Sequence, residues 1–147
     1  MQISGSQKIA APRQVVWDAL HDAETLRQCL PGCETAEFKS ENRLAIAVKV
    51  SFGIFSRVFK GRVKLSDKRP PEFYRMSGEG KGGIAGFAKG GADVRLREDG
   101  ADTILSYDVK AQIGGKLAQL GQRLVNGAAK KIADDFFKNF AAEVAKG

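Results

Sequence analysis

Hydrophobic and polar residues alternate through the middle of the chain, and this period of two changes to a helical period near both ends. The alternation predicts strands over residues 1–10, 34–39, 43–52, 58–68, 72–81, 84–97 and 103–112. Two short helices are predicted over residues 13–21, directly after Pro12, and over residues 23–29. The connections are short and rich in turn residues, as at Pro70-Pro71, so we expect the strands to form an antiparallel sheet.

The last part of the chain predicts one long amphipathic helix, which begins near Gly114 and continues through Phe140. Its apolar residues recur at every fourth position: Leu124, Ala128, Ile132, Phe136, Phe140 and Val144. Since an α-helix turns by about 100° per residue, each step of four rotates the apolar stripe by about 40°. Such a helix must pack on a twisted surface or bend, and Asn126-Gly127 is the expected place for a bend.

Two neighbouring predicted strands have unusually small side chains on one face. On the strand over 84–97 these are Gly86, Ala88, Gly90, Ala92, Val94 and Leu96, and on the strand before it Tyr74, Met76, Gly78 and Gly80. The first half of the long helix has a similar face, made of Leu117, Gly121, Leu124 and Ala128. Because protein interiors are packed to the density of organic crystals, either the helix backbone or a ligand must occupy the missing volume.

If a ligand occupies it, the sequence predicts the residues of the pocket. The predicted wall consists of Tyr74, Met76, Gly86, Ala88, Gly90, Tyr107, Leu117, Leu120, Gly121, Leu124 and Ala128. The predicted mouth, which could also touch a membrane, consists of Phe52, Phe55, Arg57 and Phe59. The polar tips of Tyr74, Tyr107 and Glu79 either orient the ligand or lie in water.

The net charge of +7 favours an anionic partner, either a nucleic acid or a membrane surface. Lys60, Arg62 and Lys64 alternate with apolar residues, which is typical of a strand with one solvated face. Nucleic acid is disfavoured, because Phe59 points away from these cations and offers them no stacking surface. The sequence has no apolar run of about 18 residues and no signal peptide at its start, so we expect a cytoplasmic protein.

No motif of the sequence predicts a catalytic or metal site. The glycines from Gly78 to Gly83 match G-x-G-x-x-G, but a strand follows them where phosphate binding requires a helix. Cys29 and Cys33 are expected to be free thiols, and as metal ligands they lack companions, because His21 is the only histidine. His21 also lacks an obvious catalytic partner, and we interpret it as structural.

The order of strand, two short helices, six strands and a long helix resembles the START-like or helix-grip superfamily, which includes polyketide cyclases and Bet v-like proteins. Within it the chain looks like the G-subunit family of carbon monoxide dehydrogenase. Segments that carry this resemblance are Ala11-Pro12 with Val16-Trp17, Cys29-Leu-Pro-Gly-Cys33-Glu34, Gly78-Glu-Gly80, Gly86-Phe-Ala-Lys-Gly90, Gly114-Gly-Lys-Leu-Ala-Gln-Leu-Gly-Gln-Arg-Leu and Asp135-Phe-Phe137. The resemblance implies a hydrophobic ligand between sheet and helix, and an association with molybdenum-containing dehydrogenases that it helps to recruit to the membrane. It brings no established catalytic residues.

These observations together predict a single α+β domain over residues 1–147 with a helix-grip fold. The expected function is that of a non-catalytic carrier or adaptor for a quinone or lipid, with no covalently bound cofactor. It would assist the membrane recruitment or electron hand-off of a molybdenum hydroxylase-type dehydrogenase, in the cytoplasm or at the inner face of the cell membrane. Two alternatives remain: a small cyclase-like or hydrolase-like enzyme that uses Tyr74, Glu79 or Tyr107, and a protein adaptor whose interior is filled.

Overall fold

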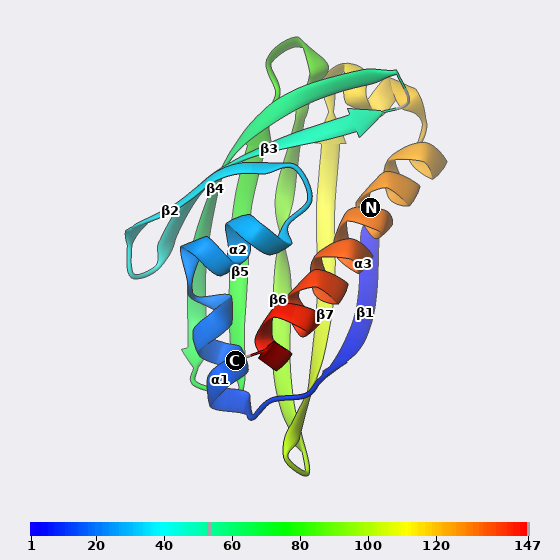
Figure 1. Ribbon diagram of the computed structural model, residues 1–147. Helices are drawn as coiled ribbons and strands as arrows, with labels where there is room; N and C mark the ends of the chain where they lie inside the picture. Colours follow the sequence, from blue (N-terminus) through cyan, green and yellow to red (C-terminus); the bar gives the residue numbers. More distant parts are fainter. Residues whose placement is uncertain (53, 147) are drawn as a thin grey trace.

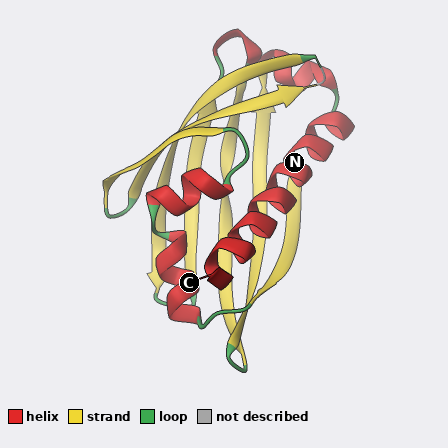
Figure 2. Ribbon diagram, in the orientation of Figure 1, coloured by secondary structure: helices red, strands yellow, loops and turns green. Residues whose placement is uncertain are grey.

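One curved sheet, partly wrapped around a long helix, makes up most of the protein (Figures 1 and 2). The computed structural model describes residues 1–52 and 54–146. Its elements are β1 (Gln2–Ile9), α1 (Arg13–Leu20), α2 (Ala23–Cys29), β2 (Cys33–Ser40), β3 (Arg43–Phe52), β4 (Phe55–Arg69), β5 (Phe73–Lys81), η1 (Gly83–Ala85), β6 (Phe87–Asp99), β7 (Asp102–Gly114), η2 (Gly115–Leu120) and α3 (Gln122–Lys146). The predicted α+β helix-grip architecture is therefore confirmed.

The described part of the sheet has seven strands in the order β1-β7-β6-β5-β4-β3-β2, and every neighbouring pair is antiparallel. The six strands from β2 to β7 follow one another as a meander, which their short connections predict. Only β1 departs from this order, because it pairs with β7 at the far edge. Helix α3 crosses the concave face, and α1 and α2 lie beside it (Figure 1).

The short helices close one end of the concave face. Val16, Trp17 and Leu20 of α1 are buried, as the apolar face of this segment predicts. The Arg13 side chain forms salt bridges with Glu72 at 3.6 Å and Glu98 at 3.3 Å, which link the start of α1 to the ends of β5 and β6. These contacts hold α1 against the sheet, so that its apolar face is available to the core.

The connection between β5 and β6 differs from the sequence prediction. Residues 83–85 form the 3-10 helix η1, and the strand that was expected from Ile84 begins at Phe87. Gly83 has φ +60° and Gly86 has φ +115°, and residues with a side chain rarely adopt either value. The glycines therefore turn the chain at this point, where the alternation pattern alone suggested a continuous strand.

The C-terminal helix is also shorter than predicted. Residues 115–120 form the 3-10 helix η2, and α3 begins only after Gly121, whose φ of +94° breaks the helical path. No interruption occurs at Asn126-Gly127, the expected place for a bend, because α3 continues as one helix from Gln122 to Lys146. The chain instead changes direction at Gly121, whose positive φ is accessible because glycine has no side chain.

Only part of the predicted apolar stripe on α3 faces the sheet. Val125, Phe140 and Val144 are buried, whereas Leu124, the first residue of the predicted stripe, is exposed. From Ala128 onward the predicted stripe does face the interior, and Phe140 is completely buried in the main core. Asn139 adds a hydrogen bond from its side-chain amide to the Cys29 carbonyl at 3.0 Å, which joins α3 to the end of α2.

Candidate functional site

An apolar cavity of about 370 Å³ lies between α3 and the concave face of the sheet. Its lining comes from nearly every element: Met1, Ile3, Leu20, Leu26, Leu30, Cys33, Phe38, Leu44, Ile46, Val63, Leu65, Tyr74, Met76, Ala92, Val94, Tyr107, Val109, Ala129, Ile132, Ala133, Phe136 and Phe137. We call it the main cavity. Its volume lies in the range of about 300–1,000 Å³ that is usual for small-molecule sites.

Helix α3 contributes an aromatic wall to the main cavity. The rings of Tyr107 and Phe137 are stacked, with centroids 4.5 Å apart and an interplanar angle of 16°. Phe136 meets Phe137 edge to face at 4.9 Å and stacks on Phe140 at 5.7 Å. This continuous ring packing fixes the distance between α3 and the sheet along one side of the cavity.

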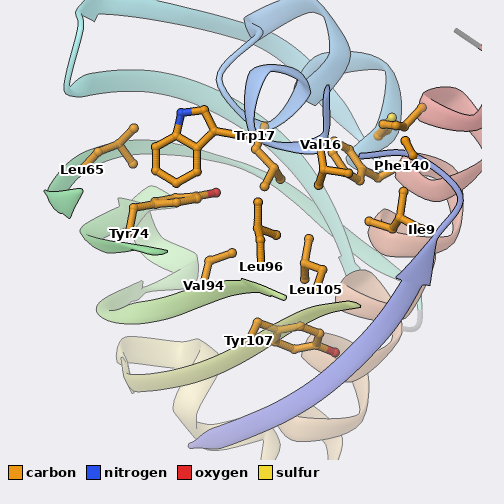
Figure 3. Packing of buried hydrophobic residues seen from close by; sticks show 14 of the residues in the cluster. Ile9, Val16, Trp17, Leu65, Tyr74, Val94, Leu96, Leu105, Tyr107 and Phe140 are labelled. Atoms are coloured by element: carbon orange, nitrogen blue, oxygen red, sulfur yellow. The ribbon is translucent and has the colours of Figure 1, made fainter. Parts of the chain in front are cut away.

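Tyr74 belongs to a second aromatic cluster at the α1 side. Its ring meets Trp17 edge to face at 5.3 Å and His21 at 5.0 Å, while Trp17 and His21 stack at 4.5 Å. Figure 3 shows Tyr74 and Trp17 packed together, with Val94 and Leu96 beside the Tyr74 ring. Burial raises the pKa of Tyr74, so its hydroxyl stays protonated at physiological pH. Tyr74 therefore brings a neutral hydrogen-bond donor to an apolar cavity.

His21 has a structural role in this cluster, as the sequence suggests. Its Nδ1 lies 2.7 Å from the Trp17 carbonyl oxygen, and because a carbonyl can only accept, Nδ1 donates. Burial lowers the pKa of His21, so the ring is neutral near pH 7. Its Nε2 is buried and has no hydrogen-bond partner among the described residues. His21 does not line the main cavity.

A second, smaller cavity of about 210 Å³ continues from the main one toward the start of α3. Met1, Ala129 and Ile132 line both cavities and form the boundary between them. The remaining walls of the smaller cavity are Val50, Phe59, Gly80, Ala88, Ile113, Leu117, Val125 and Ala128. The two cavities follow one another along α3, which gives the apolar space an elongated shape.

The structure brings six of the predicted pocket residues to these cavities. Tyr74, Met76 and Tyr107 line the main cavity, and Ala88, Leu117 and Ala128 line the smaller one. Five others lie elsewhere. Leu120, Gly121 and Leu124 border a separate groove at the junction of η2 and α3, together with Ser51 of β3.

Gly86 and Gly90 also lie outside both cavities. A Cβ at either glycine would overlap a main-chain carbonyl oxygen of β7, that of Gly114 for Gly86 and that of Lys110 for Gly90. These glycines allow strands to approach closely, which is a common reason for glycine inside a sheet. The volume missing at these two positions is therefore filled by neighbouring backbone.

The predicted mouth residues are placed only in part. The side chains of Phe52 and Phe55 lie outside the described residues, while Arg57 is exposed. Phe59 is buried and lines the smaller cavity, so it does not lie at an open mouth. Glu79, proposed from the sequence as a polar group of the pocket, is exposed, and its Oε1 lies 3.9 Å from Nζ of Lys81.

Sequence reasoning missed the part of the main cavity that comes from the N-terminal half. Leu20, Leu26 and Leu30 approach from α1, α2 and the turn after α2, and Phe38 and Ile46 from β2 and β3. The alternation of Leu44 with Ile46 could have identified β3 as a wall. Nothing in the sequence pattern indicated that α2 would cover the same space.

The cysteines and acidic groups form no metal centre among the described residues. Cys29 is buried and Cys33 lines the main cavity, and both are free thiols. Burial raises the pKa of each thiol, so neither is a reactive thiolate at neutral pH. In residues 1–52 and 54–146, no helix is long and apolar enough to cross a membrane.

Comparison with known proteins identifies the fold and the family. A conserved protein from Geobacillus kaustophilus has a similar structure, with a TM-score of 0.91, 29% sequence identity and coverage of 99% of this chain and 96% of that one. A START superfamily protein from Mycobacterium smegmatis matches with a TM-score of 0.75 and 15% identity, over 99% of this chain and 97% of that one. The ZhuI aromatase/cyclase from Streptomyces sp. R1128 matches with a TM-score of 0.70 and 12% identity, over 99% and 94%.

Among curated proteins, no sequence matches the chain. The low identity of the last two structures shows the helix-grip fold alone. The family model of CoxG, the G-subunit of carbon monoxide dehydrogenase, matches residues 5–145, which is nearly the whole sequence. The chain therefore belongs to the CoxG family of carbon monoxide dehydrogenase proteins.

Proposed function

We propose that this protein is a non-catalytic carrier that holds one lipophilic molecule between α3 and the sheet. The family and the START-like fold suggest a hydrophobic ligand, and the lining of the main cavity carries the proposal. Of its twenty-two residues, only Tyr74, Tyr107 and Cys33 have a side-chain hydroxyl or thiol, and the others are apolar. Such a surface binds apolar molecules by removing them from water.

Burial of apolar surface supports a bound ligand. A ligand that buries about 200 Å² of apolar surface gains about 5 kcal/mol. The walls of the main cavity are almost entirely apolar, so they offer this gain to a lipophilic molecule.

The hydroxyls of Tyr74 and Tyr107 supply the expected polar contacts. Neither hydroxyl has a hydrogen-bond partner among the described residues, although both side chains are buried. Each could donate to a carbonyl or hydroxyl oxygen of a ligand. We propose a quinone or a lipid as the bound molecule, because both combine an apolar chain with one or two such oxygens.

Family membership supports the second part of the proposal. The carrier would work beside a dehydrogenase of the carbon monoxide dehydrogenase type, a molybdenum hydroxylase, and assist its membrane recruitment or its electron hand-off. A lipophilic molecule in the main cavity would link these two roles. It is poorly soluble in water, so it would travel between the membrane and the protein partner inside an apolar cavity.

One observation favours a second candidate, a small enzyme that acts on a hydrophobic substrate. The buried and neutral Tyr74 could donate a hydrogen bond to an oxyanion, and the fold is shared with an aromatase/cyclase. A general base is missing from this arrangement, because the described residues that line the main cavity include no carboxylate and no histidine. The lining thus supports binding more strongly than catalysis.

Native mass spectrometry of the purified protein, followed by solvent extraction and ultraviolet absorbance of the extract, tests the proposal. We expect one lipophilic molecule per chain, chemically unchanged after incubation with the protein. If the cavity neither retains such a molecule nor takes up added ubiquinone-1 or lysophospholipid, the carrier function is wrong. Conversion of an added compound into a product would support the enzyme instead.

A further inference from the structure

Positive charge is concentrated in one half of the protein. Residues 49–64, 79–91 and 110–131 contain twelve of the 24 lysines and arginines but only one of the 17 acidic residues. These segments are neighbours in the sheet and at the start of α3, as the pairing of Lys60 with Lys81 shows. We call them the basic half. The rest of the chain has more acidic than basic residues.

The cations of the basic half are available to a partner. All twelve are exposed: Lys49, Arg57, Lys60, Arg62, Lys64, Lys81, Lys89, Lys110, Lys116, Arg123, Lys130 and Lys131. Within the described part of the chain, only Lys81, Lys130 and Lys131 form salt bridges. The other nine form none there, and together the twelve cations create a positive field over this half.

Exposed apolar side chains gather in the same half. Six of the seven large apolar residues that are exposed among the described positions belong to it. Ile54 in the β3–β4 turn is 94% exposed, Ile84 in η1 is 69% exposed and Leu124 at the start of α3 is 52% exposed. The others are Val58, Phe87 and Leu120. Single exposed apolar side chains are common, but several gathered in one region and bordered by polar residues indicate an interaction surface.

The turns that carry these side chains meet at one end of the molecule. The end of β3, η1, η2 and the start of α3 lie together at the top of Figure 1. Helices η1 and η2 contact each other, and Ser51 at the end of β3 borders one groove with Leu120 and Leu124. Apolar tips surrounded by cations thus form a single surface, which we call the basic end.

We propose that the basic end docks on an anionic lipid bilayer. Lysine and arginine bind the negative surface of acidic phospholipids, while Ile54 and Ile84 project from separate turns and can enter the headgroup layer. A nucleic acid fits this surface less well, because its exposed apolar tips among the described side chains are mainly aliphatic, with Phe87 as the one aromatic ring. A protein partner fits less well too, because lysine is depleted in protein–protein interfaces and is abundant on this surface.

This docking would place the start of α3 and the walls of the smaller cavity next to the lipid. Leu117 and Val125 belong both to that cavity and to the η2–α3 region. The purpose of docking, exchange of a lipophilic molecule with the bilayer, rests on the proposed carrier function. The binding to lipid itself does not, and the two can fail separately.

Sedimentation with phospholipid vesicles tests the proposal on the full chain. We expect binding to vesicles of phosphatidylcholine mixed with phosphatidylserine, weak binding to phosphatidylcholine alone, and a loss of binding as salt is raised. Equal binding to both vesicle types overturns it. So does binding to a single-stranded oligonucleotide or to polyglutamate without binding to anionic vesicles.

Two matched pairs of variants locate the surface. The double variant Lys60→Glu/Lys116→Glu changes the charge at the basic end. The double variant Arg97→Glu/Lys138→Glu makes the same change of charge outside the basic half. All four original side chains are exposed and form no salt bridge among the described residues. Each lysine near an anionic surface contributes about fivefold to binding, so the first pair should weaken it roughly 25-fold or more. An equal loss in the second pair overturns the assignment.

A further pair of variants tests the contribution of the exposed apolar side chains to vesicle binding. Ile84→Ser should weaken vesicle binding, whereas Val15→Ser on α1, which is also exposed, should not. Circular dichroism shows whether each variant is folded. A variant that fills the main cavity, Ala133→Phe, should still bind vesicles, and this separates a failure of docking from a failure of the carrier function. Unchanged binding by Ile84→Ser would contradict insertion of this end.

Discussion

Gly5 on β1 lies directly beneath the side chain of Tyr107 on β7. The two residues are paired in the sheet, and a Cβ at Gly5 would be 2.5 Å from the Tyr107 hydroxyl oxygen. Because position 5 has no side chain, the Tyr107 ring can lie across β1 and stack on Phe137 of α3. One glycine on the edge strand thus controls a contact between sheet and helix at the wall of the main cavity.

Replacing Gly5 by alanine should therefore displace the Tyr107 ring. We expect Gly5→Ala to lower the free energy of unfolding by about 1–3 kcal/mol, as overpacking usually does. Urea denaturation measures this change. In a Tyr107→Leu background the added methyl group meets no ring, so the same substitution should cost much less. Equal costs in the two backgrounds would show that the ring is not the cause.

Two glycines of the C-terminal region should respond in opposite directions to the same substitution. Gly121 joins η2 to α3 with φ +94° and ψ 146°, so Gly121→Ala should lower the unfolding free energy by about 1–3 kcal/mol, although open space surrounds the position. Gly127 lies inside α3, also in open space. Gly127→Ala should raise stability by about 0.5–1 kcal/mol. Thermal unfolding compares both variants, and a stabilising Gly121→Ala would contradict the observed break.

His21 should make the protein less stable in mild acid. Burial lowers its pKa below the ordinary value of 6.5, so the folded state binds the proton less tightly than the unfolded state. Its contribution is present above pH 6.5 and is lost as the pH falls through the lowered pKa. NMR titration gives this pKa without ambiguity, because the chain has one histidine. In His21→Phe this part of the pH dependence should disappear, and an unaltered profile would argue against it.

Tyr74 should make the protein less stable at alkaline pH. Burial raises its pKa above the ordinary value of 10, so the unfolded state ionises first and the unfolding free energy falls as the pH rises above 10. Tyr74→Phe should remove this loss. The substitution should also weaken a ligand that carries an oxygen by up to about tenfold, the value of one hydrogen bond, and leave a pure hydrocarbon unaffected. Phenolate absorbance and binding titrations measure the two effects.

The sequence predicts the secondary elements well because alternation and helical spacing are local properties. Residues 23–29 and 43–52 were predicted with the bounds that the structure shows, and Val16, Trp17 and Leu20 face the core as expected. The prediction failed where glycine changes the backbone path. Glycines with positive φ lie at both places, Gly83 and Gly86 at the two ends of η1 and Gly121 between η2 and α3. Their effect on chain direction cannot be derived from hydrophobic spacing.

The cavity was predictable only on the side of the sheet where small residues alternate with Tyr74 and Met76. Leu120 and Leu124 were assigned to it from their spacing, but both are exposed. Leu124 shares one continuous helix with Phe140, and a rotation of about 40° at each step of four places it about 160° around the helix from that buried ring. The opposite wall, with Leu26 and Phe38, depends on how α2 and β2 fold over the concave face. That is a tertiary arrangement, and no spacing within either segment encodes it.

Two matched variants of α3 test most directly whether a lipophilic molecule binds in the main cavity. Ala133 lines the cavity and Ala142 is exposed on the same helix, so Ala133→Phe fills the site and Ala142→Phe does not. Ala92→Leu on β6 is a second filling variant, in case Ala133→Phe is poorly folded.

The measurement is a titration with N-phenyl-1-naphthylamine, followed by energy transfer from Trp17, the single tryptophan, which contacts Tyr74 of the cavity wall. The structure predicts saturable binding with one site in the original chain and in Ala142→Phe. It predicts that both filling variants lose this binding while they remain folded by circular dichroism. Undiminished binding in the folded filling variants would contradict the assignment of the main cavity as the ligand site.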